Sequence, residues 1–290
     1  MIEPTSSKQM SKETAEWTDL LIYGTLLPGC RLQNQISGCL RRGPVILEGA
    51  KLYDLGYFSG LVQEEGFVIG EWISVSPMLL EELDQIEGYD VEREPKDCLY
   101  IRKNVEIQRL MDGKSFDVEA YFYNRSSKHL LPIDHGCYRR YLDEQDEKGS
   151  WLIAFGSNLD QHRLESRVGK IGNGRAGWIP NFKLVFNKLS YSESGETFAN
   201  IQYHPTAQTS AVAWWLDQSQ LDLLDEFEGT PDHYLRMVIP FVELDSPHVI
   251  EYCQAYVAHP NTLGPGIPSK SYRKHLEMGY LEYGFGDVPS

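Results

Sequence analysis

Short apolar runs alternate with polar turns along the whole chain, and two pairs of these runs resemble each other. Residues 20–26 (LLIYGTL) and 151–157 (WLIAFGS) each read as a buried strand that runs into a glycine turn. Runs at 67–73 and 211–215 are rich in β-branched and aromatic residues, which is typical of further strands. The hydrophobic pattern therefore predicts a set of short strands in each half.

One amphipathic helix stands out in each half. In the first half, Ser76 is the expected N-cap and Pro77 the first helical residue. In the second half, Asp217 and Gln220 form a capping-box pair. The expected apolar faces are Leu79, Leu80, Leu83 and Ile86 in the first helix, and Leu221, Leu224 and Phe227 in the second. Many strands with few helices predict an α+β fold, each half a small mixed β-barrel or curled sheet.

The chain repeats itself once. Three elements recur in the same order: a glycine turn at Gly24 and Gly156, a Leu-Asp-x-x-Glu-Gly helix end at Glu87 and Glu228, and a Tyr-x-Arg that starts at Tyr100 and Tyr234. Three shared elements in one order predict a tandem duplication. The glutamate and the tyrosine are 13 residues apart in the first half and 6 apart in the second, so the first half carries an insertion there.

A charged run over 143–150 separates the halves. It contains no apolar residue and includes Gly149 near its end. We therefore expect a domain over 18–147 and a second domain over 148–290, with residues 1–17 as a polar tail. The alternative is that this run is a long surface loop within one domain.

Charge and cysteine content limit the partners and the compartment. The chain has 27 Lys and Arg against 42 Asp and Glu, a net charge of −15, which argues against a nucleic-acid or membrane-surface partner. The acidity favours neutral or cationic ligands, or serves solubility alone. Five cysteines without a CxxC pair, together with no visible signal peptide or membrane-spanning run, predict a cytoplasmic protein.

Glu87 and Glu228 occupy an unfavourable place for a carboxylate. Each directly precedes a glycine that ends a helix, where the helix dipole is negative, and each adjoins an apolar face. Both effects raise a carboxyl pKa, and a raised pKa suits a general base near neutral pH. The alternative is a solvated glutamate at a helix end.

The glycine turns are candidate anion sites, because small residues after a strand can expose consecutive backbone N–H groups. A plain strand-to-loop turn is the alternative. Residues 172–177 fit GxGxxG, but the helical segment before them and Pro180 after them favour a loop over a nucleotide site. The eight histidines show no metal-ligand spacing, so no metal site is expected.

These motifs together resemble the γ-glutamylcyclotransferase superfamily. The second half is similar to γ-glutamylcyclotransferase itself through Phe-Gly-Ser-Asn-Leu (155–159), Phe-Lys-Leu-Val-Phe (182–186), Leu-Asp-Glu-Phe-Glu-Gly (224–229) and the stretch 268–279. The first half resembles the AIG2-like and γ-glutamylamine cyclotransferase branch through Tyr-Gly-Thr-Leu (23–26), Leu-Asp-Gln-Ile-Glu-Gly-Tyr (83–89) and Tyr-Phe-Tyr-Asn (121–124).

The resemblance implies an enzyme that releases 5-oxoproline and a free amine from a γ-glutamyl amide, by attack of the substrate's own α-amine, without a metal or organic cofactor. It implies Glu87 and Glu228 as catalytic acid–base residues. It implies a substrate-binding set formed by Tyr23, Gly24, Thr25, Leu26 and Tyr100 in the first half, and by Phe155, Gly156, Ser157, Asn158 and Tyr234 in the second. Phe155 departs from the tyrosine usual in the family.

Other hypotheses stay open. One or both halves could be non-catalytic modules that bind a metabolite, or one half could catalyse while the other supports it. A narrower variant is removal of a γ-glutamyl protecting group from an aminoglycoside-type natural product, which only the acidity favours. The released amine, the more active half and the oligomeric state are left open.

Overall fold

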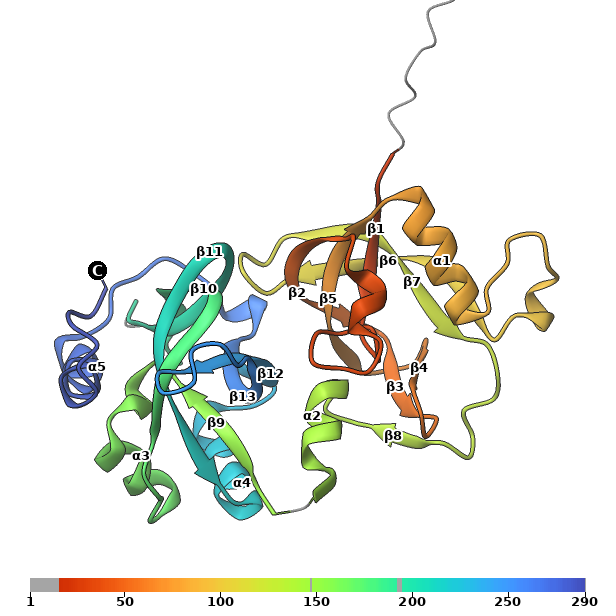
Figure 1. The fold of residues 1–290 in the computed structure, drawn as a ribbon. Coiled ribbons are helices and arrows are strands. Elements are labelled where there is room, and N and C mark those ends of the chain that lie inside the picture. The colour runs from red at the N-terminus through yellow and green to blue at the C-terminus, as the bar shows by residue number, and fades with distance from the viewer. Residues whose placement is uncertain (1–15, 147, 192–194, 290) are drawn as a thin grey trace, which may run out of the picture.

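A computed structural model describes residues 16–146, 148–191 and 195–289 of the chain. It contains two closed five-stranded barrels side by side (Figure 1). The first barrel has the strand order β1-β5-β2-β6-β7 and the second the order β10-β11-β9-β13-β12. The predicted α+β class and the tandem pair of small barrels are confirmed.

The barrels are built from corresponding strands. The first comprises β1 (Thr18–Ile22), β2 (Leu40–Glu48), β5 (Phe67–Val75), β6 (Tyr100–Arg109) and β7 (Ser115–Tyr123). The second comprises β9 (Ser150–Ala154), β10 (Arg175–Leu189), β11 (Thr197–Leu216), β12 (Tyr234–Glu243) and β13 (Glu251–Ala258). Each barrel is closed by a parallel pair, β1 with β7 and β9 with β13. A small sheet of β3 (Lys51–Asp54), β4 (Ser59–Val62) and β8 (Leu131–Ile133) adjoins the first barrel.

The two predicted helices form with the predicted caps. In α1 (Pro77–Glu87), Ser76 accepts from the Leu79 amide, and in α4 (Gln218–Glu228) both bonds of the capping box are present. Gly88 and Gly229 end these helices with φ values of 65° and 66°, a left-handed conformation that glycine adopts without strain.

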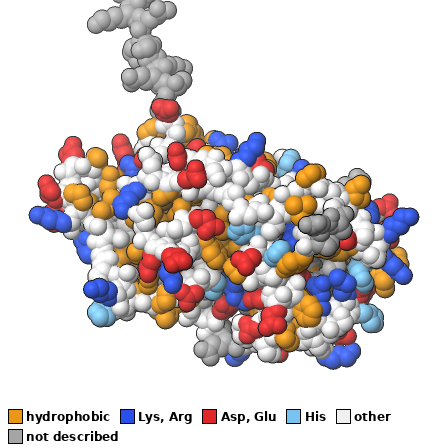
Figure 2. All heavy atoms as spheres, turned by 180° about the vertical axis from the view of Figure 1, so that it is seen from behind, with side chains coloured by type: hydrophobic (Ala, Val, Ile, Leu, Met, Phe, Trp, Pro, Cys, Tyr) orange, Lys and Arg blue, Asp and Glu red, His pale blue; other side chains and the backbone are white. Residues whose placement is uncertain are grey.

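The other helices differ between the halves. They are α2 (Tyr138–Asp143), α3 (Gln161–Val168) and α5 (Lys270–Glu282), with 3-10 turns η1 (Gln33–Ile36), η2 (Pro95–Asp97), η3 (Glu144–Asp146), η4 (Ser157–Leu159) and η5 (Pro260–Thr262). None of the described helices is long and apolar enough to cross a membrane. Acidic side chains are spread over the face drawn in Figure 2, with Lys and Arg side chains among them.

Burial along the predicted helix faces stops before their last apolar positions. Leu79, Leu83, Leu221 and Leu224 are buried, whereas Ile86 is 40% exposed and Phe227 is 53% exposed. Each of these two side chains lies in the last turn of its helix, next to the pocket-facing glutamate. The helix ends are therefore open toward solvent and are not sealed into the core.

The barrels share an apolar interface. Ile46, Ile69, Leu110 and Cys137 from the first half belong to the core cluster that fills the second barrel. Helix α2 lies between the barrels (Figure 1). The boundary predicted between 147 and 148 stays a prediction, because residue 147 lies outside the described residues, as does most of the predicted tail over 1–17.

Candidate functional site

Each half holds one pocket with the same construction. The first pocket is lined by the loop after β1, by the end of α1 and by tyrosines of β6 and β7; its residues are Leu21 to Leu26, Phe58, Ser59, Glu87, Tyr100 and Tyr121. The second pocket is lined by Ile153 to Asn158, Ala199, Glu228, Tyr234, Tyr256 and Tyr272. The structure therefore brings all the predicted site residues to two pockets, one per half.

The glycine in each loop lies close to the pocket wall, so a larger residue there would crowd it. A Cβ at Gly24 would lie 2.6 Å from the Ser59 hydroxyl, and one at Gly156 would lie 3.0 Å from the Tyr272 hydroxyl. The backbone N–H groups of Gly24, Thr25 and Leu26 make no hydrogen bond to any residue in the described parts of the chain. These amides are available to a ligand, as the nest hypothesis requires.

Glu87 reaches the first pocket without a charged partner. Within the described ranges it forms no hydrogen bond or ion pair, and burial alone raises the pKa of its carboxyl from 4.5 to about 7. The sequence prediction attributed the raised pKa to burial and to the helix dipole together; in the structure burial is its cause. A carboxyl with this pKa is poised to exchange a proton near neutrality.

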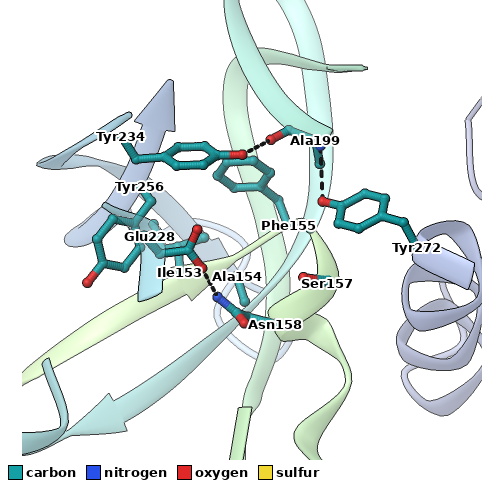
Figure 3. A pocket seen from close by; sticks show the side chains of 11 residues that line it. Ile153, Ala154, Phe155, Ser157, Asn158, Ala199, Glu228, Tyr234, Tyr256 and Tyr272 are labelled. Carbon is teal, nitrogen blue, oxygen red and sulfur yellow. Dashed lines mark hydrogen bonds between the residues drawn. The ribbon is translucent and has the colours of Figure 1, made fainter. Parts of the chain in front are cut away.

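Glu228 reaches the second pocket with two partners. Arg167 Nη1 donates to its Oε1 at 2.8 Å and Asn158 Nδ2 donates to the same oxygen at 3.0 Å. Figure 3 shows the Glu228 carboxylate directed toward the loop that carries Asn158. Arg167 also donates to Asn158 Oδ1 at 2.9 Å, so the three side chains form one closed hydrogen-bonded set.

Tyrosines form the remaining walls, and their hydroxyls are bound to the protein. Tyr100 donates to Ser59 O at 2.7 Å and Tyr234 donates to Ala199 O at 3.0 Å, in equivalent positions of the two barrels. Burial raises the pKa of both hydroxyls well above their usual value, so these tyrosines stay neutral. They shape the pockets and leave each glutamate as the titratable group facing its loop.

Tyr23 and Phe155 differ in a way that the geometry explains. Tyr23 Oη donates to Tyr121 O at 2.5 Å, across the parallel strand pair that closes the first barrel. Phe155 lacks this bond and is buried in the core of the second barrel. The hydroxyl absent from the second half is therefore one that binds a neighbouring strand in the first.

Sequence reasoning missed several residues of the pocket walls, among them Ser59 in the first half and Tyr272 in the second. Ser59 is 3% exposed and its hydroxyl is buried without a hydrogen-bond partner in the described parts of the chain, although it lines the first pocket. Tyr272 comes from α5 and its hydroxyl accepts from Ala199 N at 3.0 Å beside the second pocket (Figure 3). The shared hydrogen bonds to Ser59 and Ala199 show that these two residues occupy equivalent positions.

A second chamber opens beside the second pocket, and we call it the basic chamber. It shares Ser157, Glu228, Tyr234 and Tyr272 with the second pocket and adds Arg163, Arg167, Lys188, Tyr191, Phe198 and Phe227. Lys188 is 1% exposed, and its Nζ lies 3.1 Å from His233 Nδ1 and 4.7 Å from the centre of the Tyr191 ring. Burial lowers the pKa of Lys188 to about 8.

The first pocket has no such cations in its lining, where Glu87 is the one charged residue among those that the structure describes. A separate groove at the end of α1 is lined by Glu81, Asp84, Asp90 and Arg93, with Asp84 paired to Arg102 and Asp90 to Arg93. No group of metal-ligating side chains occurs among the residues that the structure describes. The two halves therefore share a pocket and differ in the charge beside it.

Known proteins resemble this chain at three levels. Residues 20–140 match the family model described as γ-glutamyl cyclotransferase, AIG2-like. Human γ-glutamylcyclotransferase is 27% identical over 144 residues, which cover 48% of this chain and 74% of that protein. The crystal structure of YkqA from Bacillus subtilis aligns with 92% of this chain and 93% of its own, with a TM-score of 0.73 at 16% identity, which shows a shared two-barrel fold.

Proposed function

We propose that this chain is a tandem member of the γ-glutamylcyclotransferase superfamily and that it converts a γ-glutamyl amide into 5-oxoproline and a free amine. The observation that carries the proposal is that Glu87 and Glu228 each line a pocket with the glycine loop of the same half. A glutamyl group between loop and carboxylate would have its amine near the acid–base residue and its carbonyl near backbone donors.

In the proposed reaction the Glu87 carboxylate accepts a proton from the substrate's α-ammonium group. The freed amine attacks the γ-carbonyl carbon, and the N–H groups of the loop stabilise the developing oxyanion. Glu87 gives this proton to the leaving nitrogen, the tetrahedral intermediate collapses and the original C–N bond breaks. Glu87 then accepts the second proton of the ring nitrogen and passes it to the released amine, which leaves as an ammonium ion while Glu87 returns to the carboxylate. The proton balance closes without a cofactor, and holding both reacting groups of one molecule in place supplies much of the rate.

The charge beside each pocket supports different leaving amines for the two halves. Arg163, Arg167 and Lys188 would favour an amine that carries an anionic group at the second site. The lining of the first pocket has Glu87 as its one charged residue in the described structure, which would favour a neutral or cationic amine there. A polycationic amine of the aminoglycoside type would therefore suit the first site and be repelled from the second.

Half-catalytic function is the second candidate, and one observation favours it. Arg167 already occupies the Glu228 carboxylate, so the substrate's ammonium would have to compete with a guanidinium there. In that case the second half binds a γ-glutamyl metabolite and the first half alone turns it over.

An assay for 5-oxoproline with γ-glutamyl amides tests both candidates. Glu87→Gln or Glu228→Gln should lower turnover at its own site about a hundredfold or more, because each removes the proton acceptor while keeping the size of the side chain. If both sites catalyse, only the double variant loses all activity. If Glu87→Gln alone abolishes it, the half-catalytic function is favoured, and full activity in the double variant would refute the proposed chemistry.

A further inference from the structure

Arg236 is a buried cation that the second barrel does not neutralise with its own strands. Its side chain lies on β12 and is fully buried. On the neighbouring strand β13, the side-chain amide oxygen of Gln254 accepts a hydrogen bond from Arg236 Nη1 at 2.7 Å. The α4 residue Asp225 binds Nη2 at 2.8 Å. Within its own half the buried guanidinium therefore has one carboxylate and one neutral amide as partners, and burial makes it sensitive to any further carboxylate that pairs with it.

The first half shows what is missing. Arg102 is equivalent to Arg236, because Arg102 pairs with Tyr121 in the β6–β7 ladder and Arg236 pairs with Tyr256 in the β12–β13 ladder. Arg102 has two carboxylates from its own domain, Asp84 and Glu119.

Gln254 in the second barrel occupies the position equivalent to Glu119 in the first. Each lies two residues before the tyrosine of its strand, on the same side of the same ladder. The second half therefore carries an amide where the first half carries a carboxylate.

The missing carboxylate comes from the segment between the barrels. Glu144, directly after α2, lies with its Oε1 at 3.0 Å from Arg236 Nη1. Arg140 of α2 holds the same oxygen through its Nε at 2.8 Å and lies 3.7 Å from Asp225. Glu144 precedes the predicted second domain, so a residue outside that domain completes its charge network.

This network reaches the wall of the second pocket in one step. Asp225 accepts from the hydroxyl of Tyr256 at 2.7 Å, and Tyr256 lines the pocket. Asp225 also lies one turn before Glu228 on α4, so the orientation of Asp225 bears on both pocket residues. We propose that Glu144 is a positioning residue of the second site, acting through Arg236 and Asp225 on Tyr256 and α4.

The inference rests on the proposed function for its kinetic readout. In a Glu87→Gln chain, only the second site would act. There, Glu144→Gln should lower kcat/KM about tenfold, since it leaves the guanidinium groups of Arg140 and Arg236 with Asp225 as their one shared carboxylate. The matched control is Glu119→Gln, which should impair the first site in a Glu228→Gln chain and leave the second site unchanged in the Glu87→Gln chain.

A pair of compensating substitutions distinguishes a positioning role of Glu144 from a general loss of stability. The pair Asp143→Asn and Gln254→Glu gives Arg236 a carboxylate from its own barrel, as Arg102 has. Gln254 Nε2 now donates to Asp143 Oδ2 at 2.7 Å, and in the pair the direction reverses, with the introduced amide donating to the introduced carboxylate. In this background Glu144→Gln should change kcat/KM less than about twofold. An equal loss in both backgrounds, or a loss of stability with unchanged kcat/KM, overturns the inference.

Binding distinguishes this inference from the proposed reaction. If the Glu87→Gln chain shows no turnover, the same cycle is measured as the affinity for 5-oxoproline by calorimetry in a Gly24→Leu chain, where the added side chain obstructs the first pocket and the second site reports. A tenfold loss with Glu144→Gln that the rescue pair removes would support positioning while the catalytic proposal fails. Equal affinities in all four chains, or no binding by the second site, would overturn it.

Discussion

The pockets of the two halves have the same backbone arrangement, but their glutamates differ in their charged and hydrogen-bonding partners. Both place a helix-end glutamate against a glycine loop, with tyrosines from equivalent strands around them. Glu87 has no partner in the described structure and a raised pKa, whereas Glu228 is held by Arg167 and Asn158. The repeated fold positions the carboxylate, and Arg167 of α3 gives Glu228 an ionic partner that Glu87 lacks among the described residues.

Three elements supply the residues that distinguish the second site. Arg167 comes from α3, which follows the glycine loop where the described first half has a 3-10 turn. Tyr272 comes from α5 near the end of the chain, and Glu144 comes from the segment between the barrels. The repeat therefore provides two barrels with equivalent pockets, and side chains from the segments around the barrels make the two sites different.

Replacing the two glutamates by glutamine should change the free energy of unfolding in opposite directions. Between the unfolded pKa of 4.5 and the folded value of about 7, native Glu87 keeps a proton that the unfolded chain has released. Folding stability is therefore lost as pH rises through this window, and Glu87→Gln should regain about 3 kcal/mol above it. Glu228→Gln should instead destabilise by about 2 kcal/mol, because Arg167 loses its ionic partner.

Denaturant unfolding at acidic and slightly basic pH measures both effects, with each variant serving as the control for the other. A change of the same sign in both variants would remove the electrostatic contrast between the halves.

The second-largest effect should be on the preference of the two sites for the charge of the leaving amine. In the Glu87→Gln chain, Arg163→Gln should lower kcat/KM for γ-glutamylglycine about tenfold, because the basic chamber loses a cation. The same substitution should leave kcat/KM for γ-glutamylglycinamide, which lacks the carboxylate, nearly unchanged. Equal losses for the two substrates would show that Arg163 supports the fold and does not select the amine.

Ser59 should give the smallest effect. Its hydroxyl lines the first pocket without a partner among the described residues, so a ligand that bonds to it would lose about fivefold in affinity with Ser59→Ala. Stability should not fall, because removing an unpaired buried hydroxyl is not costly. Ala199→Ser is the matched change in the second half. Unchanged ligand affinity in Ser59→Ala would exclude Ser59 as a contact residue.

Local patterns predicted much of this molecule. The Ser76 cap, the Asp217–Gln220 capping box and the glycines after Glu87 and Glu228 depend on neighbours within one helical turn, so the sequence alone identifies them. The ordered repeat then predicted that the glutamates and loops would meet.

Contacts between distant segments were beyond such reasoning. Arg167 and Glu228 are 61 residues apart, and nothing in the local pattern around either marks the other as a partner. The presence of Gln254 in place of a carboxylate becomes visible only when the strand registers of the two barrels are compared. The exposure of Ile86 and Phe227 follows from the open helix ends, which a helical periodicity does not reveal.

The dependence of 5-oxoproline formation on pH in the Glu228→Gln chain tests the central claim most directly, because only the first site then acts. We expect kcat/KM to rise with pH through an inflection at about 7, the pKa of the buried Glu87 carboxyl. A profile without an inflection near neutrality, or equal activity after the further change Glu87→Gln, would contradict the account.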